Sequence, residues 1–113
     1  MINTDIVKAL ADFLTQNKLT ISVAESCTGG SLASALTSLS GASIYFDCGF
    51  VAYSNKAKQD LLYVNKDTIT KYGAVSEEVA LEMVNGVIKN STSDFALAIT
   101  GIAGPTGGTT AKP

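Results

Sequence analysis

The segment "TISVAESCTGG", residues 20–30, joins a short apolar run to a pair of glycines. The apolar run is brief and partly β-branched, which is typical of a buried strand. The glycines permit a tight turn, and the segment that follows predicts a helix over about residues 30–39. The chain therefore places a carboxylate and two possible nucleophiles, Ser26 and Cys27, where a strand ends and a helix begins.

The rest of the chain alternates helices and strands in the same way. Further helices are predicted over about 6–14, 55–62, 66–72 and 77–89, with Ser76 as the N-cap of the last, and further strands over 43–54, with a bulge at Gly49, and 95–100. This order predicts an α/β layered domain. If the strands are parallel neighbours, the glycine-rich stretches at 29–30 and 101–108 meet beyond the strand C-termini, where ligands bind in open α/β sheets.

Composition limits the classes of function. The 113 residues predict a single domain, 1–113, and 46% apolar with 16% charged residues indicates a globular chain. The net charge is −2 without runs of like charge, which argues against a nucleic-acid partner. The two cysteines have no ligand-like spacing, and Asp5 and Asp12 interrupt the first helical stretch, so we expect a reduced, cytoplasmic protein without a membrane segment.

The chain contains no histidine, which excludes Ser-His-Asp and Cys-His catalysis and histidine-bound metals within it. Ser26 could attack a carbonyl carbon while N–H groups of the following helix hold the oxyanion, or it could be an N-cap. The residues alone favour the cap. Cys27 could be a thiolate nucleophile, but a small buried filler is favoured.

Without histidine, a serine nucleophile needs a base such as a neutral lysine. Tyr53 and Lys58, in "AYSNKAK", lie at a predicted strand-to-helix joint. Burial, or the like charge of Lys56, could lower the pKa of Lys58, and Tyr53 could relay the proton. The alternative is a solvated helix with Tyr53 in the sheet core, and the residues alone favour it. The loop "GIAGPTGG" is a weak signal for an anion, because the lysine of a Walker A loop is missing.

Four motifs together, "AESCTGG", "GFVAYSNKAK", "YGAVSEEVA" and "ITGIAGPTGGTTAKP", resemble the CinA carboxy-terminal domain family, the nicotinamide-nucleotide amidases. The resemblance covers about residues 20–113. It implies a three-layer α/β/α sandwich on a mixed, mostly parallel sheet. It also implies a protein, often a homodimer in this family, that needs no metal or cofactor and deamidates nicotinamide mononucleotide to nicotinate mononucleotide and ammonia, a reaction of NAD recycling. The alternative is a non-catalytic nucleotide-binding or dimerising module of the same fold.

The resemblance also implies the site. Ser26 would be the nucleophile, with Tyr53 and Lys58 as its activating pair. The Gly101–Gly108 loop, preceded by Thr100, is expected at the ribose-phosphate end, and Glu25 would either orient Lys58 or bond backbone near the turn. The substrate-binding residues implied are Glu25, Thr28, Gly29, Gly30, Asn55, Thr100, Gly101, Gly104, Gly107 and Gly108.

In the family, "AKP" continues into another strand and a final helix. Because this sequence starts with its own helix and stops at Pro113, we expect a stand-alone type of member that lacks its last strand and helix. The sheet edge left exposed would invite pairing with another chain.

Overall fold

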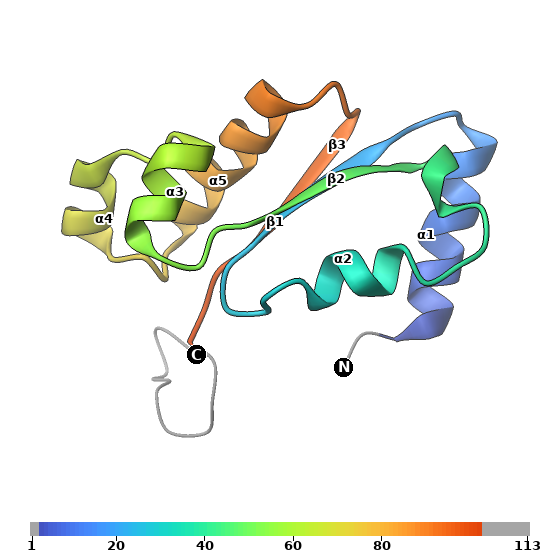
Figure 1. The fold of residues 1–113 in the computed structure, drawn as a ribbon, viewed down its shortest axis with the longest axis horizontal. Helices are drawn as coiled ribbons and strands as arrows, with labels where there is room; N and C mark the ends of the chain where they lie inside the picture. The colour runs from blue at the N-terminus through green and yellow to red at the C-terminus, as the bar shows by residue number, and fades with distance from the viewer. Residues whose placement is uncertain (1–2, 103–113) are drawn as a thin grey trace.

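Helices cover both faces of a three-stranded parallel sheet in the computed structural model, which describes residues 3–102 (Figure 1). In chain order the elements are α1 (Thr4–Gln16), β1 (Ile21–Glu25), α2 (Ser31–Leu36), the 3₁₀ helix η1 (Ala42–Ile44), β2 (Phe46–Val51), α3 (Asn55–Leu62), α4 (Lys66–Tyr72), α5 (Glu77–Asn90) and β3 (Phe95–Ile99). Figure 1 shows α1 and α2 on one side of the sheet and α3, α4 and α5 on the other. The predicted three-layer α/β class is confirmed, and the described strands are all parallel.

The strand order is β2-β1-β3, with β1 in the middle. Glu25, the last residue of β1, is paired with Val51 of β2 and with Ile99 of β3. All three strands therefore end at the same edge of the sheet. The expectation that the segments following β1 and β3 meet at this edge is confirmed for the described residues.

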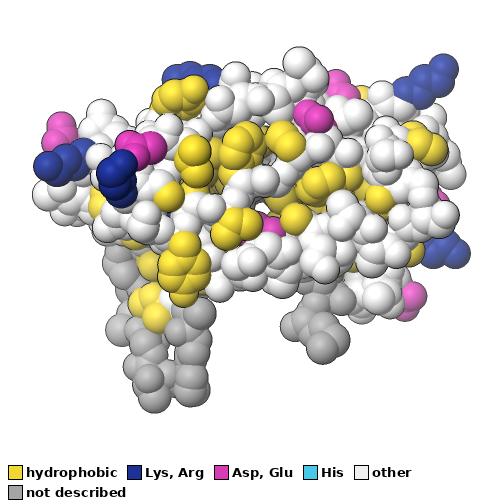
Figure 2. All heavy atoms as spheres, viewed as in Figure 1, with side chains coloured by type: hydrophobic (Ala, Val, Ile, Leu, Met, Phe, Trp, Pro, Cys, Tyr) yellow, Lys and Arg dark blue, Asp and Glu magenta, His cyan; other side chains and the backbone are white. Residues whose placement is uncertain are grey.

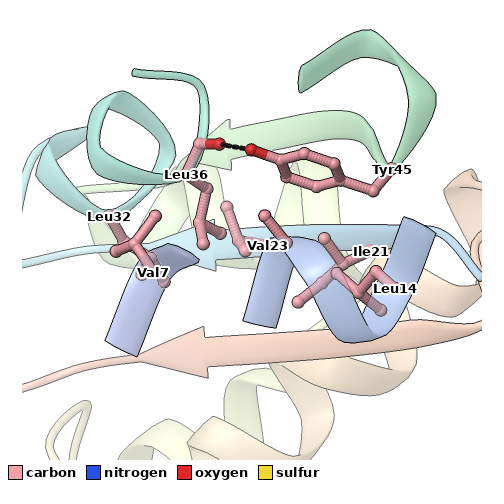
Figure 3. Close-up of a cluster of buried hydrophobic side chains, with 8 residues drawn as sticks. Val7, Leu14, Ile21, Val23, Leu32, Leu36 and Tyr45 are labelled. Carbon is pink, nitrogen blue, oxygen red and sulfur yellow. Dashed lines mark hydrogen bonds between the residues drawn. The ribbon is translucent and has the colours of Figure 1, made fainter. Parts of the chain in front are cut away.

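Each face of β1 belongs to a different hydrophobic core. Ile21 and Val23 pack against α1 and α2, whereas Ala24 packs against α3 and α5. Figure 3 shows the first core, in which the Tyr45 hydroxyl donates a 2.6 Å hydrogen bond to the carbonyl of Leu36. The residues labelled there are Val7, Leu14, Ile21, Val23, Leu32, Leu36 and Tyr45. Because successive strand residues point to opposite faces of the sheet, neighbouring side chains at the end of β1 point toward opposite helical layers.

The second core fixes α3 against α5. A Cβ atom at Gly86 of α5 would lie 2.1 Å from the carbonyl oxygen of Leu62 in α3, a distance that no side chain tolerates. The two helices therefore approach each other at a position that requires glycine. This contact sets the position of the helix that carries Lys58.

Two predicted boundaries are wrong. The helix predicted over 30–39 ends at Leu36, where the Thr37 and Ser38 hydroxyls donate to carbonyls of the preceding turn. The strand predicted over 43–54 begins only at Phe46, because Ala42–Ile44 form η1. The pairing of β1 with β2 changes register between Ile21 and Val23, which pair with Phe46 and Gly49. This irregularity lies next to Gly49, where the sequence predicts the bulge.

Figure 2 shows hydrophobic side chains gathered across the middle of one face, over β2, with most charged side chains toward the two ends. None of the helices within residues 3–102 has the length and apolar character needed to cross a membrane.

Candidate active site

Glu25 caps the helix that follows the strand. Its side chain is fully buried, and its carboxylate accepts hydrogen bonds from the Thr28 hydroxyl at 2.6 Å and from the N–H groups of Gly30, Leu32 and Ala33 at 3.2, 2.8 and 2.8 Å. Burial alone would raise the pKa of this carboxyl, but the four hydrogen bonds outweigh burial and hold the pKa below its usual value. Of the two roles that the sequence left open for Glu25, the structure shows hydrogen bonding to the backbone near the turn, and Glu25 does not orient Lys58.

The turn after β1 depends on its two glycines. Gly29 and Gly30 have φ values of +58° and +108°, and Gly30, not Ser26, is the N-cap of α2. The prediction of Ser26 as an N-cap is wrong. The N–H groups at the start of α2 are also not available for an oxyanion, because Glu25 already binds them.

Ser26 faces the layer opposite to Glu25. Its hydroxyl makes a long contact of 3.5 Å to the backbone carbonyl oxygen of Tyr53, and the Lys58 ammonium donates to the same oxygen at 3.0 Å. Ser26 and Lys58 are both buried, with 6% and 2% of their surfaces exposed. The sequence-predicted trio therefore comes together, but through the main chain of Tyr53. The Tyr53 side chain is 63% exposed.

Lys58 is a buried cation without a carboxylate partner in the described part of the chain. Burial lowers the pKa of its ammonium, with a smaller opposing effect from the nearby Cys27 thiol. The interpretation of Lys58 as part of a solvated helix is wrong, because the side chain points into the protein. Lys56 does not contribute to the lowered pKa: it is exposed, pairs with Asp60, and its own pKa is raised by that hydrogen bond and charge.

Ser26, Tyr53 and Lys58 line a pocket of about 300 Å³ at the carboxyl edge of the sheet, which we call the Ser26 pocket. Its described lining residues are Ser26, Cys27, Tyr53, Asn55, Lys58, Ala74, Val75, Thr100, Gly101 and Ile102. Cys27 is half-buried and lines this pocket, so its interpretation as a buried filler is wrong. The Thr100 hydroxyl donates to the carbonyl of Ala74 at 2.9 Å, which joins β3 to the loop before α5.

Not every predicted binding residue reaches this pocket. Asn55, Thr100 and Gly101 line it, whereas Glu25, Thr28, Gly29 and Gly30 form the turn behind it. Gly104, Gly107 and Gly108 lie outside the described residues. Sequence reasoning did not name Ala74, Val75 and Ile102 as site residues, although they lie within the motifs "YGAVSEEVA" and "ITGIAGPTGGTTAKP".

The described residues offer little for binding a metal. Between residues 3 and 102, Cys, Asp and Glu side chains do not gather into a group of three or more that could hold a metal ion. The charged groups at the site are the buried Lys58 inside the Ser26 pocket and the hydrogen-bonded Glu25 behind it.

Comparison with known proteins agrees with the fold and the motifs. The family model for the CinA C-terminal domain matches residues 3–113. A CinA-like protein of Chlorobium chlorochromatii is 56% identical over 106 residues, and one of Endomicrobium trichonymphae is 50% identical over 111 residues. These alignments cover 94% and 98% of this chain but 25% and 26% of the relatives. The chain thus spans about a quarter of the length of these curated relatives.

Solved structures give the same result. The competence/damage inducible protein CihA from Agrobacterium tumefaciens superposes with a TM-score of 0.91 at 46% identity, covering 97% of this chain and 67% of that one. A CinA superfamily protein from Escherichia coli superposes with a TM-score of 0.89 at 39% identity, covering 100% of this chain and 68% of that one. The chain belongs to the CinA C-terminal domain family.

Proposed function

We propose that this domain hydrolyses the carboxamide of nicotinamide mononucleotide, giving nicotinate mononucleotide and ammonia through an acyl-enzyme on Ser26. The observation that carries the proposal is the convergence of the Ser26 hydroxyl and the buried Lys58 amine on one carbonyl oxygen inside the Ser26 pocket. A nucleophile beside a base whose pKa is lowered is the arrangement that covalent catalysis requires. The family resemblance supplies the substrate.

Burial of Lys58 supports its role as the base. A lysine with an ordinary pKa near 10.5 is almost fully charged at neutral pH and cannot accept a proton. Desolvation lowers this pKa and so increases the fraction of neutral amine. Neutral Lys58 takes the proton of Ser26 while the serine oxygen forms a bond to the carboxamide carbon.

The first step gives a tetrahedral intermediate whose oxygen carries the negative charge. Since Glu25 occupies the N–H groups of α2, the donors for this oxygen must come from the turn itself. The N–H groups of Cys27 and Thr28 directly follow the nucleophile and make no hydrogen bond within residues 3–102. An N–H directly after a nucleophilic serine is a common oxyanion donor. We assign the oxyanion to these two groups.

The remaining steps return the groups to their starting state. The C–N bond breaks and protonated Lys58 gives its proton to the leaving nitrogen, which departs as ammonia. Water then gives a proton to Lys58 and adds to the acyl-enzyme ester. As the ester C–O bond breaks, protonated Lys58 gives this proton to the Ser26 oxygen, and the released acid becomes a carboxylate by losing its remaining proton to solvent.

The test is ammonia release from nicotinamide mononucleotide by the wild type, Ser26→Ala and Cys27→Ala. Loss of Ser26 removes the nucleophile and should reduce turnover to near the uncatalysed rate, whereas Cys27→Ala should keep most of it. An active Ser26→Ala variant with an inactive Cys27→Ala variant would reverse the assignment. Tight nucleotide binding by a wild type that releases no ammonia would favour a binding module instead.

We further propose, with the family resemblance as support, that the protein acts as a homodimer on this small nucleotide without a cofactor and binds neither nucleic acid nor membranes. Light scattering of the purified protein tests the dimer. A monomer at micromolar concentration would refute that part of the proposal.

A further inference from the structure

A second hollow lies beside the Ser26 pocket, between β3 and the start of α5. This hollow, which we call the α5 hollow, is lined by residues 75–77, Ala80 and residues 98–100, and has a volume of about 350 Å³. It shares Val75 and Thr100 with the Ser26 pocket. The Ser26 pocket alone is at the lower end of the usual size for a small-molecule site, and the α5 hollow roughly doubles the space. A ring bound next to Ser26 therefore has room for its substituent along β3.

Most polar side chains of the α5 hollow already have partners. The Thr100 hydroxyl donates to the carbonyl of Ala74 at 2.9 Å. The Ser76 hydroxyl donates to the carbonyl of Gly73 at 2.8 Å and accepts from the N–H of Val79 at 3.2 Å. Glu77 differs, because its carboxylate accepts no hydrogen bond and joins no ion pair among residues 3–102.

The charge of the α5 hollow limits what it can bind. Glu77 is the only charged side chain among its described lining residues. A carboxylate without a neighbouring cation repels a phosphate group but accepts hydrogen bonds from neutral hydroxyls. Such bonds to a charged acceptor are stronger than bonds between neutral groups.

We propose that Glu77 accepts hydrogen bonds from the ribose hydroxyls of the nucleotide whose nicotinamide ring lies in the Ser26 pocket. The inference rests on the proposed function for the identity of the ring and adds a specificity residue to it. The α5 hollow holds the sugar, and the phosphate lies elsewhere. Glu77 thereby selects a ribonucleotide over a nucleotide without sugar hydroxyls.

Calorimetric binding in a Ser26→Ala background tests the assignment without turnover. The two ligands are nicotinamide mononucleotide and its 2′,3′-dideoxy analogue. With Glu77 present, the ribonucleotide should bind about 10- to 100-fold more tightly, as expected for hydrogen bonds to a charged acceptor. Adding Glu77→Ala should abolish this difference by weakening the ribonucleotide alone.

Glu78→Ala is the matched control. Glu78 is also an exposed carboxylate in the first turn of α5, but it does not line the α5 hollow. Both carboxylates lie in the first turn of α5, where the helix dipole favours negative charge, so we expect the two variants to have similar stability. Glu78→Ala should leave the affinities for both nucleotides unchanged.

Three results would overturn the inference: equal weakening of both nucleotides by Glu77→Ala, unchanged affinities in that variant, or no binding of either nucleotide. Ammonia release is measured separately with Ser26 intact. A protein that shows the Glu77-dependent difference but releases no ammonia refutes the amidase proposal and leaves the role of Glu77 standing.

Discussion

Replacement of Glu25 by alanine should destabilise the fold strongly, although Glu25 lies behind the Ser26 pocket and not in it. The change removes the acceptor of four hydrogen bonds. The Thr28 hydroxyl can rotate toward another acceptor, and the N–H of Gly30 makes the longest of these bonds, at 3.2 Å. The N–H groups of Leu32 and Ala33, each 2.8 Å from the carboxylate, are left without a partner, the first in a buried and the second in a partly buried position.

The magnitude follows from these two groups. A buried donor left unsatisfied costs about 1–3 kcal/mol, so two cost about 2–6 kcal/mol. Because small domains are stable by only about 5–15 kcal/mol, this loss is a large part of the total.

Urea unfolding followed by far-ultraviolet circular dichroism measures the effect, since the chain contains no tryptophan for fluorescence. With a slope of about 1–3 kcal/mol per molar urea, the midpoint should fall by about 2 M. Glu78→Ala, at an exposed carboxylate, should move the midpoint much less.

The pH dependence gives a second readout. The pKa of Glu25 in the folded protein lies below the ordinary value of 4.5, so its stabilising effect is complete above pH 4.5 and is lost as pH falls through the folded pKa. The difference between wild type and Glu25→Gln should therefore shrink on acidification. An alanine variant as stable as Glu78→Ala, or a difference that stays constant with pH, would refute the role of Glu25 as a charged cap.

Other predictions concern α3 and its support. Lys58→Met should lower kcat by about 10²- to 10⁴-fold, the usual contribution of a general base, and flatten the rise of rate with pH, whereas Lys56→Met should change little. Because burial lowers the pKa of Lys58 in the folded protein, the charged ammonium destabilises the folded state at every pH below that folded pKa, and the effect is lost as pH rises toward the unfolded pKa. Lys58→Met should therefore also raise the free energy of unfolding at neutral pH, as urea unfolding at pH 7 would show. An unchanged pH–rate profile would exclude Lys58 as the base. Gly86→Ala should lower the free energy of unfolding by about 2 kcal/mol, although alanine has the better helix propensity, because the new methyl group meets the Leu62 carbonyl. The same variant should lower kcat, because it displaces α3. Asn85→Ala, on the exposed side of α5, should leave the stability unchanged or raise it slightly. Gel shifts at low salt should show no tight binding to duplex DNA, because the eight basic residues are outnumbered by ten acidic ones.

Local sequence signals predicted the periphery of the fold well. The helices predicted over 55–62 and 66–72 match α3 and α4, and Ser76 is the N-cap of α5 as expected. Caps, glycine stops and apolar periodicity act within one turn of helix, so a single sequence contains them.

The candidate site was less accessible to the same signals. Lys58 lies in a polar stretch, and its side chain is buried because α3 packs against α5 and turns this residue toward the Ser26 pocket, which no local pattern records. The role of Glu25 depends on α2 folding back to bring two N–H groups to the carboxylate. The family resemblance predicted that Ser26, Tyr53 and Lys58 lie together, because a family's motifs reflect a known folded structure. The residues alone favoured Ser26 as a helix cap and Lys58 on a solvated helix.

The contact that joins Ser26 to Lys58 is made by a main-chain atom, the carbonyl oxygen of Tyr53. A systematic alanine scan cannot remove that oxygen, so it would score position 53 by its exposed ring and miss the shared acceptor. An amide-to-ester replacement at Ser54, introduced by chemical synthesis, would weaken the Tyr53 carbonyl as an acceptor while leaving its side chain in place. The acceptor shared by Ser26 and Lys58 therefore depends on the path of the backbone and not on the side chain at position 53, and natural sequence variation at that position need not reveal it.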